Sequence, residues 1–192
     1  MNSEKVATML AQLKDISEFT VDLAYSSLLC GSEEIADYVI AIEEKMDKLH
    51  TEFEMTVLGL RDTRPSKGLL GLIRLSLAAE ELVDAAKMMA EIVKLGGRAH
   101  PIIRRAFEEA EETIVLGRIS ETSPLAGKSL GELGLEDDIG MRVIAVERCE
   151  SWTYNPPDTF VLAVGDTVIA RGYSEGRMRF LTLMEPEYMY EQ

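Results

Sequence analysis

Apolar residues recur at spacings of three and four through the first 112 positions, the period of an amphipathic helix. The pattern predicts three long helices, over residues 2–29, 32–60 and 66–95. The first and third stop where glycine follows, as helices commonly do. A shorter helix over 101–112, with Pro101 in its first turn, leads out of this region.

The second predicted helix has the clearest single face. Ser32 precedes Glu33 and Glu34, so a capping hydroxyl and two carboxylates complement the helix N-terminus. Its apolar positions fall within about 40° of one line on a helical wheel. They are Ile35, Val39, Ile42, Met46, Leu49, Phe53, Val57 and Leu60. The third helix is apolar around most of its circumference, which predicts a central packing position.

From Thr113 onward the pattern changes to short β-rich segments, IVLGRI, MRVIAVER and DTVIARG. Turn residues such as Ser123-Pro124 and Gly165-Asp166 separate them. Short helices are expected over 129–135 and 174–183. The chain is therefore predicted to be a multidomain α and α/β protein. An antiparallel three-helix bundle (1–98) and a connecting helix (99–112) precede a small α/β domain (113–192).

The formal charge of −14 bears on the choice of partner. Residues 1–112 hold 21 acidic and 13 basic side chains, a net of −8, and residues 113–192 hold 13 and 7, a net of −6. Neither half offers the basic surface that nucleic acid or anionic lipid requires. We therefore expect no nucleic-acid partner, and a cation or a basic protein suits this charge better.

Targeting and redox features predict a cytoplasmic protein. The N-terminus MNSEKVATML lacks the continuous apolar core of a secretory signal. Arg74, Glu80 and other charges interrupt the longest apolar stretch, so no membrane insertion is expected. Cys30 and Cys149 show no metal-ligand spacing and are expected to be reduced thiols.

Carboxylate pairs at a spacing of four are the first candidate chemistry. Glu43/Asp47 and Glu80/Asp84 each place two carboxylates on one helix face, where a divalent cation would relieve their repulsion. His50 falls between Glu43 and Asp47 on the wheel and would suit a transition metal. A solvated polar face explains the same residues, since 34 acidic residues produce such pairs readily.

The segments VIAIEEKMDKL and LAAEELVDAAKMMAEIV resemble the PhoU family. Its repeats are three-helix bundles with a Glu/Asp-x-x-x-Asp motif on each of two neighbouring helices. The resemblance implies a metal site at Glu43, Asp47, Glu80 and Asp84, with a divalent or transition metal ion. It covers one repeat where a full PhoU protein has two, which implies that two chains pair as a homodimer. Phosphate signalling of the PhoU type is one alternative function.

The segments SPLAGKSLGELGL, GMRVIAVERC and GDTVIARG resemble the TrkA-C domain, the C-terminal domain of regulators of potassium conductance. Each glycine and leucine in them also has a structural reason, so the motif reports fold first. Domains of this family pair as homodimers and bind small ligands, in some members cyclic di-AMP. The resemblance places ligand contacts at Val143, Ile144, Arg148 and Asn155. A solvated strand end explains Arg148 equally well, and an aromatic hairpin over 149–157 departs from the family pattern.

Several enzyme motifs are missing from the sequence. It contains no Gly-x-Gly-x-x-Gly for NAD, no P-loop and no Gly-x-Ser-x-Gly. Because both resemblances are to domains of transport regulators, they imply a non-enzymatic regulatory or accessory subunit of cation transport, with potassium as the expected ion. Such a regulator, of archaeal and bacterial type, would bind a membrane transporter or channel subunit and reach the membrane through it. The alternative is a metal-responsive protein that acts through the helical carboxylates.

Overall fold

The computed structural model describes residues 2–60, 66–96, 100–108 and 110–186. The chain forms two compact units, residues 1–98 and 99–192. The expected connecting helix therefore falls within the second unit. Among the described residues, no helix has both the length and the apolar character needed to span a bilayer.

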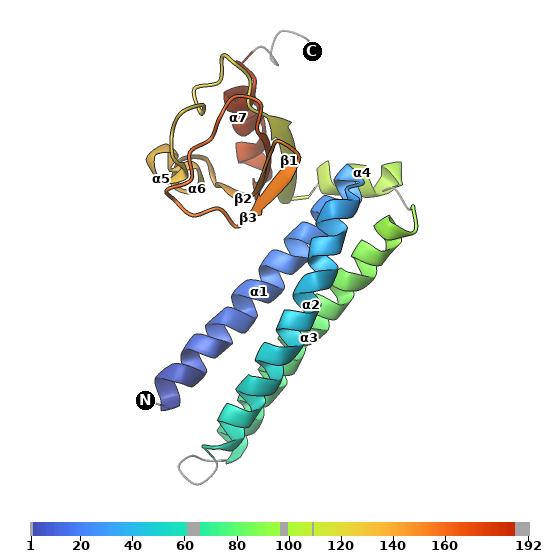
Figure 1. Ribbon diagram of the computed structural model, residues 1–192, viewed down its shortest axis with the longest axis vertical. Helices are drawn as coiled ribbons and strands as arrows, with labels where there is room; N and C mark the ends of the chain where they lie inside the picture. Colours follow the sequence, from blue (N-terminus) through green and yellow to red (C-terminus); the bar gives the residue numbers. More distant parts are fainter. Residues whose placement is uncertain (1, 61–65, 97–99, 109, 187–192) are drawn as a thin grey trace. The chain divides into compact units, whose positions relative to one another are not determined.

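The first unit is a bundle of three long helices that run side by side (Figure 1): α1 (Asn2–Cys30), α2 (Glu33–Leu58) and α3 (Ser66–Lys94). All three were expected from the apolar period. Ser32 caps α2 as predicted, because its Oγ accepts a hydrogen bond from the Ile35 N–H at 3.3 Å. Gly31, with φ of 67°, provides the left-handed turn between α1 and α2.

The core of the bundle contains the predicted α2 stripe except for Leu49, which is only partly buried. Phe53, Met46 and Val57 are fully buried, as is Leu13 of α1. The third helix differs from the prediction, because only part of its apolar circumference is covered. Val83, Ala86 and Ala90 face the core, whereas several large apolar side chains of α3 are 44–67% exposed: Leu70, Leu75, Leu77, Leu82, Met88 and Ile92.

The second unit is an antiparallel sheet with helices. Its strands are β1 (Glu112–Arg118), β2 (Met141–Arg148), β3 (Ser151–Tyr154) and β4 (Thr167–Tyr173), in the order β1-β4-β2-β3. Its helices are α4 (Pro101–Glu108), α5 (Leu130–Leu133), α6 (Leu135–Ile139) and α7 (Ser174–Met184).

Two element boundaries in this unit differ from the sequence prediction. The helix expected over 101–112 ends at Glu108, and β1 begins at Glu112. The helix expected over 129–135 is two helices, because Gly134 adopts a left-handed φ of 52° between them. Both differences arise at helix ends, where propensity gives the weakest guidance.

The hairpin of β2 and β3 turns on two residues. Arg148 pairs with Ser151, and the connecting Cys149 and Glu150 have φ of 52° and 60°. Positive φ at both positions is the requirement of a type I′ turn, which usually takes Asn-Gly. Trp152 and Tyr154 on β3 stack with ring centroids 6.2 Å apart, so the predicted aromatic hairpin is present.

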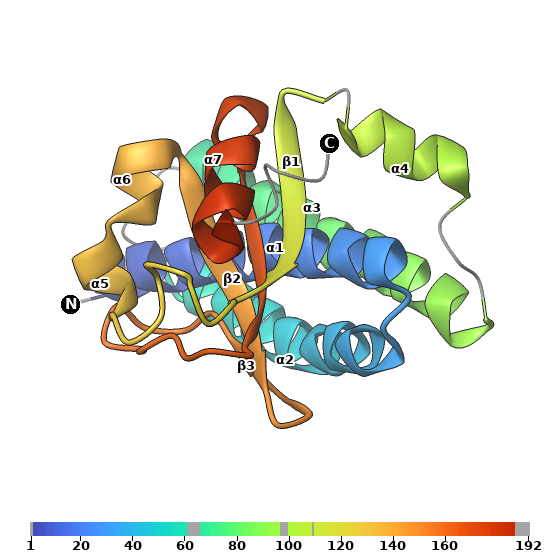
Figure 2. The same ribbon diagram turned by 90° about the horizontal axis from the view of Figure 1, so that it is seen from above.

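Helix α7 lies along one face of the sheet (Figure 2) and closes the core of this unit. Phe180 and Met184 of α7 pack with Val115, Val168 and the strand β2. Gly172 and Gly176 let this packing be close, since a Cβ at either would overlap the Gly140 or Ile139 carbonyl oxygen. The tight corner between α6 and β2 is thereby fixed against β4 and α7.

Candidate functional site

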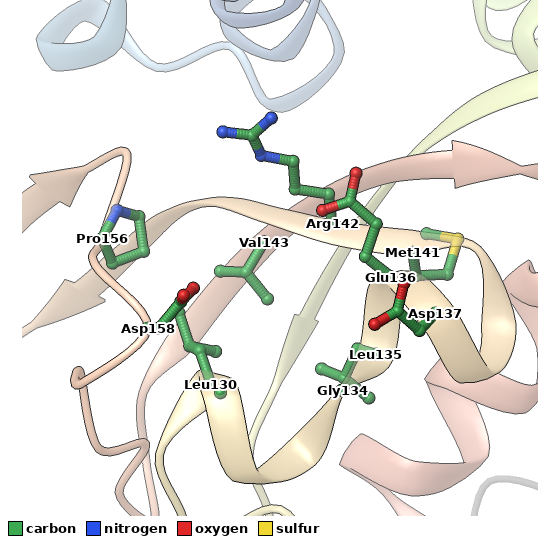
Figure 3. Close-up of a pocket in the computed structure, with 11 residues that line it drawn as sticks. Leu130, Gly134, Leu135, Glu136, Asp137, Met141, Arg142, Val143, Pro156 and Asp158 are labelled. Carbon is green, nitrogen blue, oxygen red and sulfur yellow. The ribbon is translucent and has the colours of Figure 1, made fainter.

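A pocket of about 410 Å³ lies beside the first residues of β2. Strand β3 pairs only with residues 145–148, so in the part of the chain that the structure describes the start of β2 has one edge without a strand partner. Helices α5 and α6 and the segment 156–158 border this edge (Figure 3). The lining residues are Leu130, Gly131, Gly134, Leu135, Glu136, Asp137, Met141, Arg142, Val143, Pro156 and Asp158.

A capping box fixes the α5 wall. The Ser129 N–H donates to Glu132 Oε2 at 2.9 Å, and Ser129 Oγ accepts from the Glu132 N–H at 3.3 Å. The Ser129 N–H and the Ser129 hydroxyl, which also donates to Glu132 Oε2 at 2.9 Å, hold the pKa of the Glu132 carboxyl below its usual value. Gly134 then redirects the chain into α6, which brings Glu136 and Asp137 to the pocket.

The opposite wall is formed by the segment 156–158, which packs closely against α5. The Gly131 N–H donates to the Asp158 carbonyl oxygen at 2.8 Å, and a Cβ on Gly131 would lie 3.2 Å from Asp158 Cβ. A larger residue at 131 would therefore push the wall outward. Asn155 enters this segment with φ of 46°, a conformation that asparagine tolerates better than most residues.

The charged groups at the pocket are mostly acidic and stand at its mouth. Glu136, Asp137 and Asp158 are exposed, and all three line the pocket (Figure 3). Arg142 also lines the pocket, but Figure 3 shows its guanidinium pointing away from Val143, as expected for successive residues of a strand. A ligand with N–H or O–H donors, or a cation, would meet the carboxylates, and a phosphate would meet Arg142.

The structure places some of the predicted ligand residues at the pocket and others away from it. Val143 lines the pocket, and Asn155 Oδ1 accepts from Arg142 Nη2 at 3.2 Å. Ile144 is buried at a β-bulge, where its carbonyl accepts the Asn155 N–H at 2.8 Å. Arg148 lies at the far end of β2 from the pocket.

Arg148 forms a bidentate ion pair with Asp166. Its Nε and Nη2 donate to the two carboxylate oxygens, each at 2.7 Å, and Nη2 also donates to the Val161 carbonyl at 2.8 Å. The hydrogen bonds to Asp166 raise the pKa of Arg148 further. Asp166 is 1% exposed and also accepts from the Ala163 N–H at 2.8 Å. The pair therefore joins the end of β2 to the turn before β4, and a role of Arg148 in ligand binding stays a prediction.

Sequence reasoning did not find Arg142, Asp158 or the acidic pair Glu136 and Asp137. The residues of α6 gave one usable signal, since three acids in succession follow Gly134 in the segment LEDDI. Nothing in the order of the residues indicated that the Asp158 backbone would accept a hydrogen bond from the Gly131 N–H.

One of the predicted metal ligands of the first unit, Glu43, is paired with a lysine. Lys87 Nζ binds Glu43 Oε1 at 2.7 Å, and this hydrogen bond raises the pKa of Lys87. Lys94 likewise bridges Glu33 and Asp37, at 3.3 and 2.9 Å. An ammonium group therefore stands where a metal ion would neutralise Glu43.

The remaining carboxylates approach one another without forming a ligand set. Burial and then the charge of Asp84 raise the pKa of Glu80, with a smaller contribution from Asp47, while His50 lowers it. His50 Nε2 accepts no hydrogen bond among the described residues and lies 3.5 Å from Glu54. In the described ranges, no group of three or more His, Cys, Asp or Glu side chains could hold a metal ion. As arranged, these residues do not fit the implied metal, and binding stays a prediction.

Comparison with known families matches both units. The PhoU domain matches residues 10–95, and the TrkA-C domain matches residues 115–184. The chain thus joins a PhoU domain to a TrkA-C domain, and both are domains of regulatory proteins. No curated protein matches the chain.

Three solved structures are similar to parts of the chain. The RCK_C domain dimer of S. agalactiae BusR in complex with c-di-AMP is 26% identical, covers 38% of this chain and 96% of its own, and has a TM-score of 0.36. The RCK C domain of the potassium transport protein KtrA, in complex with cyclic diadenosine monophosphate, is 24% identical. The match covers 43% of this chain and 94% of the KtrA domain, with a TM-score of 0.35. S. agalactiae BusR in complex with its busA-promotor DNA is 21% identical. The match covers 70% of this chain and 67% of the BusR chain, with a TM-score of 0.36.

Replacing Arg148 with alanine should lower the free energy of unfolding of the second unit by about 3 kcal/mol, because the buried Asp166 carboxylate loses its counter-ion. We place the loss at the lower end of the usual range, since the Arg148 side chain is 45% exposed. Urea denaturation followed by the fluorescence of Trp152 measures it. Arg118→Ala is the control, because exposed Arg118 donates only to the Gly165 carbonyl among the hydrogen bonds described. Equal stability of Arg148→Ala and wild type would contradict a structural role.

Replacing Glu80 with glutamine should raise the free energy of unfolding at neutral pH by about 0.2–0.5 kcal/mol, the repulsion of one like-charged pair four residues apart. A carboxyl whose pKa is raised by folding binds its proton more tightly when folded, so its penalty is present at neutral pH and disappears below about 4.5, the unfolded value. The advantage of Glu80→Gln should disappear there too. Thermal melts across pH measure this, with Glu44→Gln as an exposed control. A rise in melting temperature with Mn²⁺ in wild type that Glu80→Gln abolishes would instead support a metal site.

Proposed function

We propose that the protein is a non-enzymatic regulatory subunit of cation transport, with potassium as the expected ion. The TrkA-C domain senses a small ligand or ion, and the PhoU domain transmits the change or binds a membrane transporter or channel subunit. The observation that carries this proposal is the pocket beside β2, because it gives the TrkA-C domain a site with Val143 in its wall.

Pocket size and shape support a ligand of small-molecule dimensions. Its volume of about 410 Å³ falls within the roughly 300–1,000 Å³ common for such sites. Val143 and Pro156 are buried apolar residues, against which a base or another flat group packs. The unpaired edge of β2 adds backbone N–H and C=O groups that give orientation.

The charges at the pocket support two ligand classes with opposite requirements. A cyclic dinucleotide such as cyclic di-AMP places its phosphates at Arg142, where a guanidinium gives charge-assisted hydrogen bonds. The carboxylates then accept hydrogen bonds from its amino or hydroxyl groups. A cation instead binds at Glu136, Asp137 or Asp158 and is repelled by Arg142.

The variant Arg142→Ala separates these two ligand classes. If cyclic di-AMP binds, the change should weaken its affinity by about 10- to 100-fold, the equivalent of one hydrogen bond to a charged group. If a cation binds, the same change should leave its affinity equal or higher, and Asp137→Asn should weaken it. Isothermal titration of the full chain with cyclic di-AMP, K⁺ and Mg²⁺ gives each affinity.

The matched control for that titration is Arg179→Ala, which removes an exposed arginine of α7 outside the pocket lining. It should bind as wild type does. A proposal of sensing through this pocket fails if none of the three ligands binds wild type, or if Arg142→Ala, Asp137→Asn and Arg179→Ala all bind alike.

Affinity capture tests the transport role separately. Tagged full-length protein, recovered from membranes solubilised in a mild detergent, should retain a cation transporter or channel subunit, identified by mass spectrometry. The yield should change when the ligand that binds in the titration is added, because a sensor must couple its ligand to its partner. Recovery of no transport protein in either condition would count against the role.

A further inference from the structure

Helix α3 carries a second apolar face besides the one that it buries in the bundle. Eight residues on this face alternate at spacings of three and four, which is the heptad pattern of a coiled-coil seam. We call them the α3 stripe: Gly68, Gly71, Leu75, Ala78, Leu82, Ala85, Met89 and Ile92. Because the stripe has its own continuous period, it is not a random scatter of exposed side chains.

The α3 stripe is open in the single chain. Leu75, Leu82 and Ile92 are 54%, 49% and 50% exposed. A Cβ built on Gly68 or Gly71 would meet no atom within 4 Å, so the bundle itself gives no reason for glycine at these helical positions. Glycine is unfavourable in helix interiors relative to alanine. Two such residues are explained if another surface needs that space.

We propose that the α3 stripe pairs with the α3 stripe of a second copy of this chain, with the two helices antiparallel. Glycines occupy one end of the stripe, leucine and alanine alternate in its middle, and Met89 and Ile92 occupy the other end, so a two-fold axis near residue 80 opposes each large residue to a small one. Leu75 then faces the partner's Ala85, and Leu82 faces the partner's Ala78. Met89 fills the open space over the partner's Gly71. Ile92 fills the open space over the partner's Gly68.

Other occupants fit this face less well. In a parallel pair each leucine would oppose a leucine and each alanine an alanine, which would alternate tight layers with gaps. The stripe carries no charged residue although the chain has a net charge of −14, so it offers nothing to a basic or acidic partner. From Gly68 to Ile92 the contact extends about 36 Å, a long seam for two helices.

Disulfide crosslinking between two different single-cysteine chains tests the orientation. The background is the full chain with Cys30→Ala and Cys149→Gly, which removes the native thiols and suits the positive φ at 149. Chains with Leu75→Cys and with Ala85→Cys are mixed and oxidised. The antiparallel pair predicts a mixed disulfide between the two chains, and little product from either chain alone. A parallel pair predicts the reverse, and that result would overturn the proposal.

A charge placed on the α3 stripe tests whether the stripe is the contact. Leu82→Glu, added to both single-cysteine chains, should reduce the mixed disulfide by about tenfold or more, because it buries a carboxylate without a partner. Leu77→Glu is the matched control, since Leu77 is 44% exposed but lies about 140° from Leu82 on the helical wheel. It should leave the yield unchanged.

Helical content and the melting temperature of each variant show that the bundle remains folded. Loss of the mixed disulfide in both glutamate variants, or in neither, would overturn the assignment of the stripe. The inference concerns the PhoU domain alone and does not depend on the proposed ligand. Failure of crosslinking with normal ligand binding would therefore remove this pairing and leave the proposed function intact.

Discussion

The ion pair of Arg148 with Asp166 is the constraint on which the second unit depends. Asp166 is almost fully buried and would be costly there without a counter-ion. Because Arg148 also holds the Val161 carbonyl, the pair fixes both ends of the turn that leads into β4. The chain between Asp158 and Asp166 is therefore anchored at its far end to β2 and at its near end to Gly131. The wall of the pocket is the near end of this anchored segment.

In the first unit, lysines form ion pairs with carboxylates that are partly or largely exposed. Lys87 and Lys94 reach from α3 to carboxylates of α2, so ion pairs join the two helices, and the Lys87 pair engages Glu43, one of the predicted metal ligands. An ammonium group satisfies one or two oxygens without the multiple coordination that a divalent cation requires. The acidic character of the bundle is thus compatible with its folding in the absence of any ion.

The helices could be predicted from the apolar period, and both domain types from motifs that are contiguous in the sequence. The α2 stripe, the Ser32 cap and the segment SPLAGKSLGELGL are all contiguous in sequence, and each is present as expected. The pocket could be predicted only in part. Val143 was expected from the resemblance to the TrkA-C family, but Asp158 reaches the site through a backbone contact with Gly131, 27 positions earlier, which no local pattern records. Arg148 was expected to bind ligand from the same resemblance, and its ion pair with Asp166 depends on the tertiary fold.

Asn155 and the two prolines after it have a consequence for the energetics of recognition. The proline rings fix φ near −65° at two successive positions, and Pro156 is buried. The wall that they form has few conformations to lose when a ligand arrives. Immobilising a flexible loop would subtract conformational entropy from the affinity, and a rigid wall avoids most of that loss. Occupancy of this site would then follow the ligand concentration, because little of the binding free energy is used to order the protein.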